Sequence, residues 1–358
     1  MIKILTVVGA RPQFVKAAVV SRALAATGKI DEVIIHTGQH FDANMSDVFF
    51  NEMCIPAPKY NLGIGGGTHG ANTGRMLEQI EQLFLDEEPQ AVLVFGDTDS
   101  TLAAALAAAK LSIPVVHVEA GLRSFNRAMP EEINRVLTDH ISTLLFSPSG
   151  ISVENLRAEG ISNDKIHCTG DVMLDAVEMF APIAAQKTTV MSDLDLEDCG
   201  YILCTIHRKE NTDSLVRLKA IFEGLAAAEM PIILPLHPRT RNVLAANNIA
   251  LAPHIRVIDP VGYLDMIAMQ KSASLIGTDS GGVQKEAFFL GTPCITFRDE
   301  TEWTELVDIG ANALVGADAA QIGAAMRRPP QPFETQPIYG NGRAAELIAS
   351  IMVEALSR

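Results

Sequence analysis

Acidic side chains that suit proton transfer follow predicted strands in the first half of the chain. Asp97 comes just after the apolar run 91–95, and Glu119 follows the run 115–118. Glu131 stands in the first turn of a predicted helix, where capping and the helix dipole alone also favour acids. Because the carboxyl ends of parallel strands meet at one sheet edge, these carboxylates would cluster there. Clustered carboxylates shift each other's pKa and can divide acid and base roles.

Basic and imidazole side chains follow other predicted strands. Arg11 and Lys16 stand at the start of the helix that succeeds residues 2–8. In the second half, His207 and His237 each follow a strand, and each has an arginine within two residues. Such histidines are often packed loop residues. Two histidine–arginine pairs in an otherwise acidic chain nevertheless indicate a site for an anionic ligand.

The segment Ser280-Gly281-Gly282 lies between a predicted strand and a predicted helix. Backbone N–H groups and the dipole at a helix N-terminus bind phosphate, and small residues allow close approach. Glu286 stands one turn further on, where a carboxylate repels phosphate but accepts hydrogen bonds from ribose hydroxyls. Capping by Ser280 alone is the alternative. Together these residues predict a nucleoside diphosphate site, and with the first-half carboxylates they predict an enzyme of nucleotide-sugar chemistry.

The nucleotide-binding glycine motifs and metal-binding cysteine pairs give little signal. GxGxxG occurs at residues 65–70, but no clear strand precedes it, so we expect a loop there. The GxxxxGK[ST] motif is missing from the sequence. The five cysteines are scattered and form no C-x-x-C pair, which indicates neither a zinc site nor a disulfide framework. We expect catalysis without NAD, without another cofactor and without a metal ion.

Short β-branched runs alternate with longer alanine- and leucine-rich segments along the chain. This alternation predicts α/β structure, with parallel sheets built from βαβ units and helices on both faces. The alternation of predicted strands and helices stops after Gly170, where a predicted helix over 172–187 and then a polar stretch follow. We therefore expect a domain junction after Gly170. Residues 344–358 are typical of an amphipathic helix. The predicted strands cover residues 2–8, 32–36, 91–95, 115–118, 143–146, 165–168, 201–206, 231–235, 255–258, 274–277 and 294–297.

Size and charge limit the classes of function. The 358 residues suffice for two domains, and 48% hydrophobic with 20% charged residues is typical of a folded protein. The formal net charge of −15 argues against a nucleic-acid or anionic-membrane surface. The apolar stretch 102–118 is interrupted by lysine, serine and proline, so neither a membrane span nor a signal peptide is predicted. We expect a soluble protein of the reducing cytoplasm.

An ordered set of motifs gives the chain a resemblance to a known family. In chain order the motifs are GARPQFVK, GDTDST, HVEAGLRS, MPEEINR, TIHRKENT, DSGGVQKEA and FRDETEW. The chain resembles the non-hydrolysing UDP-N-acetylglucosamine 2-epimerases of bacterial envelope-polysaccharide pathways. The resemblance implies two Rossmann-like, doubly wound parallel-sheet domains facing a cleft, a fold of glycosyltransferase-B type, and a homodimer. We expect residues 1–170 to be the N-terminal domain, 171–343 the UDP-binding domain, and 344–358 a helix packing back on the first domain.

The resemblance also implies a role for each candidate residue. Asp97, Glu119 and Glu131 match the family's acid/base carboxylates, and His207 matches its essential histidine. The other candidates are expected to bind the UDP-sugar substrate. These are Arg11, Lys16, Arg135, His237, Ser280, Gly281, Gly282 and Glu286.

The implied reaction inverts carbon 2 of the sugar. The proton on carbon 2 is removed while UDP leaves carbon 1, giving a glycal, and UDP then adds back with a proton delivered to the opposite face. No carbonyl group acidifies that proton. Stabilisation of the departing pyrophosphate and placed carboxylates must therefore supply the catalysis.

Two segments depart from the commoner family pattern. Residues 301–305 read TEWTE where many members read TERPE, which removes a base near the sugar and introduces the only tryptophan. Residues 38–46 differ as well. With GARPQF, these changes look most like the subgroup that epimerises UDP-2,3-diacetamido-2,3-dideoxyglucuronic acid. That uronate and UDP-N-acetylglucosamine both stay open as substrates, and so does a regulatory second UDP-sugar site.

Three other activities fit the same architecture. A glycosyltransferase also holds a nucleotide sugar on its second domain, but three first-domain carboxylates favour an epimerase. A hydrolysing epimerase would release the free sugar and UDP. A nucleotide-sugar binding protein without turnover would keep residues 280–282 and Glu286 but would not need Asp97, Glu119 and Glu131.

Overall fold

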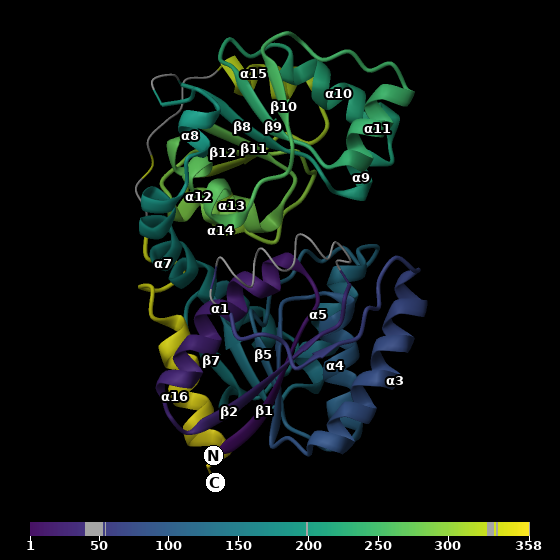
Figure 1. Ribbon diagram of the computed structural model, residues 1–358, viewed down its shortest axis with the longest axis vertical. Coiled ribbons are helices and arrows are strands. Elements are labelled where there is room, and N and C mark those ends of the chain that lie inside the picture. The colour runs from purple at the N-terminus through teal and green to yellow at the C-terminus, as the bar shows by residue number, and fades with distance from the viewer. Residues whose placement is uncertain (40–52, 54, 198–199, 328–332, 334–335, 358) are drawn as a thin grey trace. The chain divides into compact units, whose positions relative to one another are not determined.

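The computed structural model describes residues 1–39, 53, 55–197, 200–327, 333 and 336–357 (Figure 1). The chain forms two compact units, of which unit 1 comprises Met1–Glu178 with Pro337–Arg358, and unit 2 comprises Met179–Gln336. The junctions that we expect from the sequence lie after residues 170 and 343. The units divide a few residues after the first of these positions and a few before the second.

A seven-stranded sheet forms the centre of unit 1, and its neighbouring strands are all parallel. The strand order is β3-β2-β1-β4-β5-β6-β7, so the direction of winding reverses between β1 and β4. Open parallel sheets bind ligands at such a reversal. Central β4 is buried along its whole length, as its apolar sequence AVLVF requires. The strands are β1 (Ile2–Val8), β2 (Ile30–His36), β3 (Tyr60–Asn61), β4 (Ala91–Phe95), β5 (Val115–Val118), β6 (Leu144–Ser147) and β7 (Ile166–Cys168).

Helices alternate with these strands. Alanine-rich α4 packs between α3 and α5, and its buried alanines allow the close approach. The Thr98 hydroxyl caps α4 by accepting a hydrogen bond from the Thr101 N–H group. The helices are α1 (Arg11–Ala26), α3 (His69–Glu87), α4 (Asp99–Lys110), α5 (Pro130–Ile141), α6 (Gly150–Ala158), the 3-10 turn η1 (Asn163–Lys165), α7 (Val172–Lys187), which continues into unit 2, and α16 (Ala344–Leu356).

Unit 2 is built around a six-stranded sheet whose neighbouring strands are also all parallel. Its order is β10-β9-β8-β11-β12-β13, so winding reverses between β8 and β11. Leu218, Phe297 and Ile322 are among the buried residues of its core. The strands are β8 (Ile202–Thr205), β9 (Ile232–Pro235), β10 (Ile255–Ile258), β11 (Leu275–Thr278), β12 (Cys294–Thr296) and β13 (Asn312–Leu314). The helices are α8 (Val190–Asp193), α9 (Lys209–Thr212), α10 (Leu215–Leu225), α11 (Pro238–Ala246), α12 (Tyr263–Ser272), α13 (Gly281–Phe289), α14 (Thr304–Asp308) and α15 (Ala319–Arg327).

The helix α16 belongs to unit 1 although the whole of unit 2 precedes it in the chain. It packs against α1, as Figure 1 shows with the yellow and purple ribbons. Its first turn is held by Asp175, whose carboxylate accepts hydrogen bonds from the N–H groups of Ala344 (3.1 Å) and Ala345 (2.7 Å). Ile348 and Met352 are fully buried. These contacts attach the end of the chain to the first unit.

The predicted fold class, two doubly wound parallel sheets, is confirmed, as is the helix over 172–187. The strand prediction missed β3 and β13, which are only two and three residues long. Residues 65–68 form a loop that ends at Thr68, the N-cap of α3, and residues 69–70 already belong to α3. Among the described residues, no helix has the length and apolar composition that crossing a membrane requires.

Candidate active site at two strand edges

Gln13 joins the strand ends on both sides of the unit 1 reversal point. Its side-chain oxygen accepts hydrogen bonds from the N–H groups of Gly9 (2.8 Å) and Ala10 (3.0 Å), directly after β1. Its amide donates to the Phe95 carbonyl at 2.8 Å and to two threonine hydroxyls near the start of α4. Gln13 is buried. The turns after β1 and β4 are therefore held in one geometry by a single side chain.

Lys16 of α1 and Glu119, the residue directly after β5, form a buried ion pair beside this edge. Glu119 has φ = +73°, which residues with a side chain rarely adopt. Its N–H group donates to the Phe146 carbonyl at 3.0 Å. A Cβ atom at Gly96 would lie 3.3 Å from Glu119 Oε2 and 3.4 Å from Lys16 Nζ. The pair thus lies against the turn that carries Asp97.

Asp97 is paired with Arg135 of α5. Arg135 Nη2 and Nε lie 2.5 Å and 3.1 Å from Asp97 Oδ2. Arg135 Nη1 also donates to Glu132 Oε2 at 3.0 Å. The side chain of Asp97 is 29% exposed, whereas that of Arg135 is 3% exposed. Arg135, which we expect from the resemblance to bind substrate, therefore has a catalytic candidate as a partner within the protein.

Adjacent acids in the first turn of α5 have different environments. Glu132 is buried and accepts hydrogen bonds from the N–H groups of Ser124 (2.9 Å) and Phe125 (3.0 Å). Glu131 is partly exposed, and its side chain has no hydrogen bond or ion pair within the part of the chain that is described. Glu132 thus anchors a loop, and Glu131 is the acid that remains for a ligand.

A buried charge network lies behind these turns and was missed in the sequence. His117 of β5 faces the Asp139 carboxylate at 2.7 Å through Nδ1, and its Nε2 donates to the Gly96 carbonyl at 2.7 Å. Arg123 Nη1 donates to the same Asp139 carboxylate at 2.7 Å. Burial opposes ionisation, but His117 and Arg123 outweigh it and lower the pKa of Asp139. The motif HVEAGLR contains this histidine and arginine, so their charge could have drawn attention.

At the edge of unit 2, His207 follows β8 and lies beside Asp279. The exposed His207 ring has Nδ1 3.2 Å from Asp279 Oδ1. Asp279 is fully buried and accepts hydrogen bonds from the N–H groups of His207 and Arg208, both at 3.1 Å, and from the Asn211 amide. Burial opposes ionisation, but His207 and these donors lower the pKa of Asp279. Asp279 therefore orients His207, a role that the sequence did not reveal.

The N-terminus of α13 has the predicted small residues. Ser280 is the N-cap, and its hydroxyl accepts a hydrogen bond from the Val283 N–H group. Gly281 lies against the Glu302 side chain, since a Cβ atom there would collide with Glu302 Oε1. Gly282 has more room, because among the described residues the nearest atom to a Cβ there would be Ser280 Oγ at 3.9 Å.

Glu286 lies one turn further along α13 and is buried. Its Oε2 atom accepts a hydrogen bond from the Gln270 amide at 2.7 Å. Burial raises the pKa of Glu286 to about 7, and the hydrogen bond from Gln270 and the charge of Lys285 offset only part of that effect. The Glu286 carboxyl group is therefore held within the protein by burial and by Gln270, and is not a solvated acid.

Glu302 and Trp303 of the divergent segment TEWTE lie next to Gly281, and Trp303 is buried. The Lys285 ammonium lies 4.1 Å from the centre of the Trp303 ring, a cation–π contact. Arg298 Nη2 lies 3.0 Å from Glu302 Oε2. This ion pair lacks hydrogen-bond geometry, and within the described residues the Nη atoms of the fully buried Arg298 have no hydrogen-bond partner.

Two further candidates occupy less informative positions. Arg11 is the first residue of α1 and is half-buried. His237 is exposed and directly precedes α11. Of the divergent stretch 38–46, Gly38 and Gln39 are described and residues 40–46 lie outside the described residues. Gln39 Oε1 accepts hydrogen bonds from the N–H group and the hydroxyl of Ser100.

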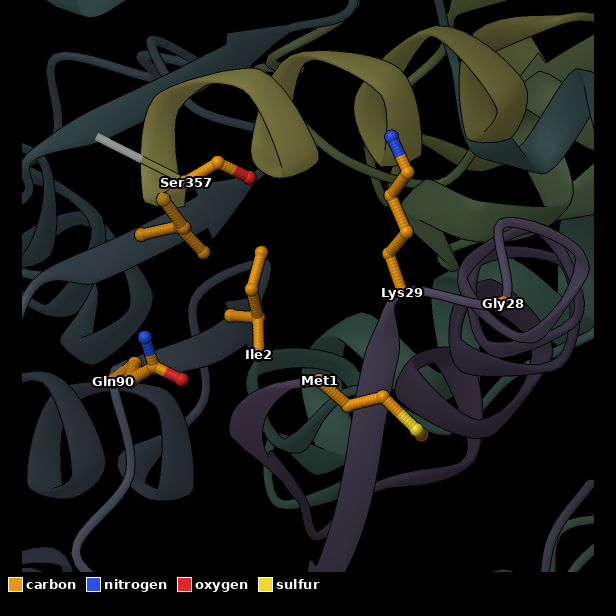
Figure 2. A pocket seen from close by; sticks show the side chains of 7 residues that line it. Met1, Ile2, Gly28, Lys29, Gln90 and Ser357 are labelled. Carbon is orange, nitrogen blue, oxygen red and sulfur yellow. The ribbon is translucent and has the colours of Figure 1, made fainter.

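A pocket lies elsewhere in unit 1 (Figure 2). It shares no residue with the predicted site. In the described part of the chain, no cluster of three or more histidine, cysteine or acidic side chains is arranged to hold a metal ion. The pocket is lined by Met1, Ile2, Gly28, Lys29, Gln90, Leu356 and Ser357.

Known proteins match this chain over its length. The family model for UDP-N-acetylglucosamine 2-epimerase matches residues 22–353. The UDP-2,3-diacetamido-2,3-dideoxy-D-glucuronate 2-epimerase of Pseudomonas aeruginosa is 52% identical, with 98% of this chain and 99% of that protein covered. The UDP-N-acetylglucosamine 2-epimerase of Methanocaldococcus jannaschii is 46% identical, with 98% of each chain covered.

Solved structures agree with the sequence matches. The M. jannaschii enzyme in complex with UDP-GlcNAc and UDP has a TM-score of 0.92 at 45% identity, covering 99% of this chain and 100% of that one. The Neisseria meningitidis enzyme bound to UDP-GlcNAc has a TM-score of 0.88 at 30% identity, covering 99% and 100%. These matches confirm the resemblance and the glycosyltransferase-B type of fold. The chain belongs to the non-hydrolysing UDP-N-acetylglucosamine 2-epimerase family.

Proposed function

We propose that this chain inverts carbon 2 of a UDP-2-acetamido sugar by elimination and re-addition of UDP. The observation that carries the proposal is the presence of two carboxylates, each with its own base, at one sheet edge: Glu119 with Lys16 and Asp97 with Arg135. General acid–base catalysis needs carboxyl groups held in fixed positions. Membership of the epimerase family supports the reaction class.

In this proposal the unit 1 edge moves protons. One carboxylate takes the proton from carbon 2 as the bond between carbon 1 and the UDP oxygen breaks, leaving a glycal. UDP then attacks carbon 1 while a carboxylic acid delivers a proton to the other face of carbon 2. Asp97, Glu119 and Glu131 are the groups that we propose for these transfers. The electron count of the sugar is unchanged, so the steps need no nicotinamide.

The unit 2 edge binds UDP in this proposal. The N–H groups at residues 280–282 stabilise the pyrophosphate as it departs, and Glu286 accepts hydrogen bonds from the ribose. His207, His237 and Arg11 compensate the negative charge that develops on UDP. We propose that residues 1–170 form the domain with the catalytic carboxylates, 171–343 the UDP-binding domain, and 344–358 the helix that packs on the first domain. We also propose that the protein is a cytoplasmic homodimer. Its product would serve envelope-polysaccharide synthesis.

For the substrate we propose UDP-2,3-diacetamido-2,3-dideoxy-D-glucuronate. The 52% identity to the P. aeruginosa enzyme that acts on this sugar supports the choice. Trp303, where many family members have arginine, is a second reason, because it changes the surroundings of α13. UDP-N-acetylglucosamine is the other candidate, supported by the M. jannaschii enzyme.

The experiment is incubation of the purified protein in deuterated water with each UDP-sugar separately, followed by proton NMR. We expect the carbon 2 epimer with deuterium at carbon 2, formed without added NAD or divalent metal, and faster with the uronate. A free sugar would indicate a hydrolysing enzyme, and transfer to an acceptor would indicate a glycosyltransferase. Binding without any exchange would contradict the proposed epimerase.

A further inference from the structure

We infer that Arg135 is a positioning residue that holds Asp97 in its reactive geometry and does not bind the substrate. The inference rests on the proposed epimerase activity and goes beyond it, since it assigns a task to α5. In the unit 1 edge, α5 reaches the turn after β4 through Arg135 and Asn134. Asn134 donates to the backbone carbonyl of Asp97 at 2.9 Å, while Arg135 binds the side chain. The residue is therefore held at both its backbone and its carboxylate.

Contacts of the guanidinium leave little freedom to Asp97. Two nitrogens of Arg135, Nη2 at 2.5 Å and Nε at 3.1 Å, contact the same oxygen, Oδ2. Both contacts go to Oδ2, and no described residue forms a hydrogen bond with Oδ1, which leaves Oδ1 for a substrate proton. The exposure of the two side chains, 29% for Asp97 and 3% for Arg135, means that a ligand reaches the carboxylate more easily than the base.

Arg135 is itself oriented from behind by Glu132. The Glu132 carboxylate accepts a hydrogen bond from Arg135 Nη1 at 3.0 Å. It also accepts hydrogen bonds from the N–H groups of Ser124 and Phe125, in the loop that follows β5. Glu132 is fully buried, and its position is fixed by those backbone groups. The guanidinium therefore lies between a structural carboxylate and a carboxylate proposed for catalysis.

An arginine suits this position better than a lysine. Its planar group offers several N–H donors at fixed angles, so it can bind two carboxylates at once and define the orientation of each. A lysine ammonium would keep the charge but would not keep both contacts in one plane. A lysine at position 135 should thus compensate the charge of Asp97 but orient its carboxylate only in part.

The test compares Arg135→Met, Arg135→Lys and Asp97→Asn with the double variant Arg135→Met/Asp97→Asn. We expect Arg135→Met to lower kcat by ~100-fold, within the usual range for loss of an acid–base group, with KM and the Kd for UDP changed by less than ~3-fold. The kcat of Arg135→Lys should be about tenfold higher than that of Arg135→Met, because lysine keeps the charge. In the Asp97→Asn background, Arg135→Met should have almost no further effect, because it acts through Asp97.

Arg123→Met is the matched control. Arg123 is also a buried arginine with two acidic partners, Asp139 and Glu159, but neither is proposed for catalysis. We expect it to lower Tm at least as much as Arg135→Met while kcat changes only a few-fold. A kcat loss that merely follows Tm across both arginine variants, or additive effects in the double variant, would overturn the positioning role. An inactive wild-type protein would overturn the proposed function itself, a result that is separate from the variant pattern.

Discussion

The two sheet edges use different means to organise polar groups. At the edge of unit 1, side chains face side chains: Lys16 pairs with Glu119, and Arg135 pairs with Asp97. At the edge of unit 2, backbone groups contribute more of the polar contacts. Asp279 accepts hydrogen bonds from the N–H groups of His207 and Arg208, and α13 begins with two glycines. Unit 1 thus presents individually held carboxylates, whereas unit 2 presents oriented dipoles.

This difference matches the chemistry proposed for each edge. Proton transfer at one carbon requires a carboxyl oxygen in one place, which an ion pair with a buried base provides. A pyrophosphate spreads its charge over many oxygens, and backbone N–H groups at a helix N-terminus suit such a ligand without adding a titratable group. Changes at the first edge should therefore affect turnover, and changes at the second should affect UDP affinity.

The largest expected effect is on turnover in unit 1. Asp97→Asn and Glu119→Gln should each lower kcat by ~100-fold or more, because acid–base groups contribute ~10²–10⁴-fold. Calorimetry should find UDP affinity within a few-fold of wild type. Glu131→Gln belongs to the same set. Near-normal turnover in all three variants would mean that these carboxylates have structural roles only and do not transfer the proton.

The next effect concerns pH and the stability of unit 2. Burial raises the pKa of Glu286 to about 7 in the folded protein, above its ordinary value of 4.5. Between these values the folded state binds a proton that the unfolded state has lost, so the free energy of unfolding falls as pH rises through this window and then levels off. The shift corresponds to roughly 3 kcal/mol at most.

Glu286→Gln should remove this pH dependence, because glutamine does not ionise. Urea unfolding of both proteins at about pH 5 and about pH 8 measures the difference. Relative to the variant, the wild-type protein should be less stable at the higher pH. Parallel stability curves for the two proteins would show that the Glu286 carboxyl does not carry the proton assigned to it.

A smaller effect is expected at Gly282. An alanine there has room in the protein, with Ser280 Oγ the nearest atom at 3.9 Å, so Tm should stay unchanged. A phosphate lying against the N–H groups of this turn would meet the new methyl group. We expect UDP to bind about tenfold more weakly, a loss of about 1.4 kcal/mol. Unchanged affinity would place the pyrophosphate away from α13.

The smallest effect has the opposite sign. The Glu302 carboxylate lies against Gly281, where it would repel a pyrophosphate bound as we propose. Glu302→Gln removes that charge, and UDP should bind a few-fold more tightly, since two charges near a protein surface interact by about 1 kcal/mol or more. The control is Asp299→Asn, an exposed acid of the same loop that pairs with Arg217. Weaker binding in Glu302→Gln would mean that this carboxylate helps to hold the ligand.

The positions of the candidate carboxylates could be predicted from the ends of the strands, but their partners could not. Asp97 and Glu119 could be assigned to one edge because each follows an apolar run that predicts a strand. The pairing of Asp97 with Arg135 was out of reach, because it depends on how α5 is rotated against the sheet. Glu131 and Glu132 are neighbours in one helical turn, and only the loop at Ser124 decides which of them is buried.

The two missed strands have a physical explanation. Strands β3 and β13 are too short to show an alternating pattern, so tertiary pairing alone defines them. The surroundings of Gly281 were equally out of reach of the sequence, because the Glu302 side chain that lies against it belongs to a later segment of the chain.

The contacts of α16 have a consequence for how this protein is made. Unit 1 takes its last helix from a segment that leaves the ribosome only after all of unit 2 has been synthesised. Until then, the surface of α1 lacks its cover, and the Asp175 carboxylate lacks the two N–H groups that it binds. The unit that comes first in translation is therefore completed last, and a fragment spanning residues 1–178 would leave that surface of α1 uncovered.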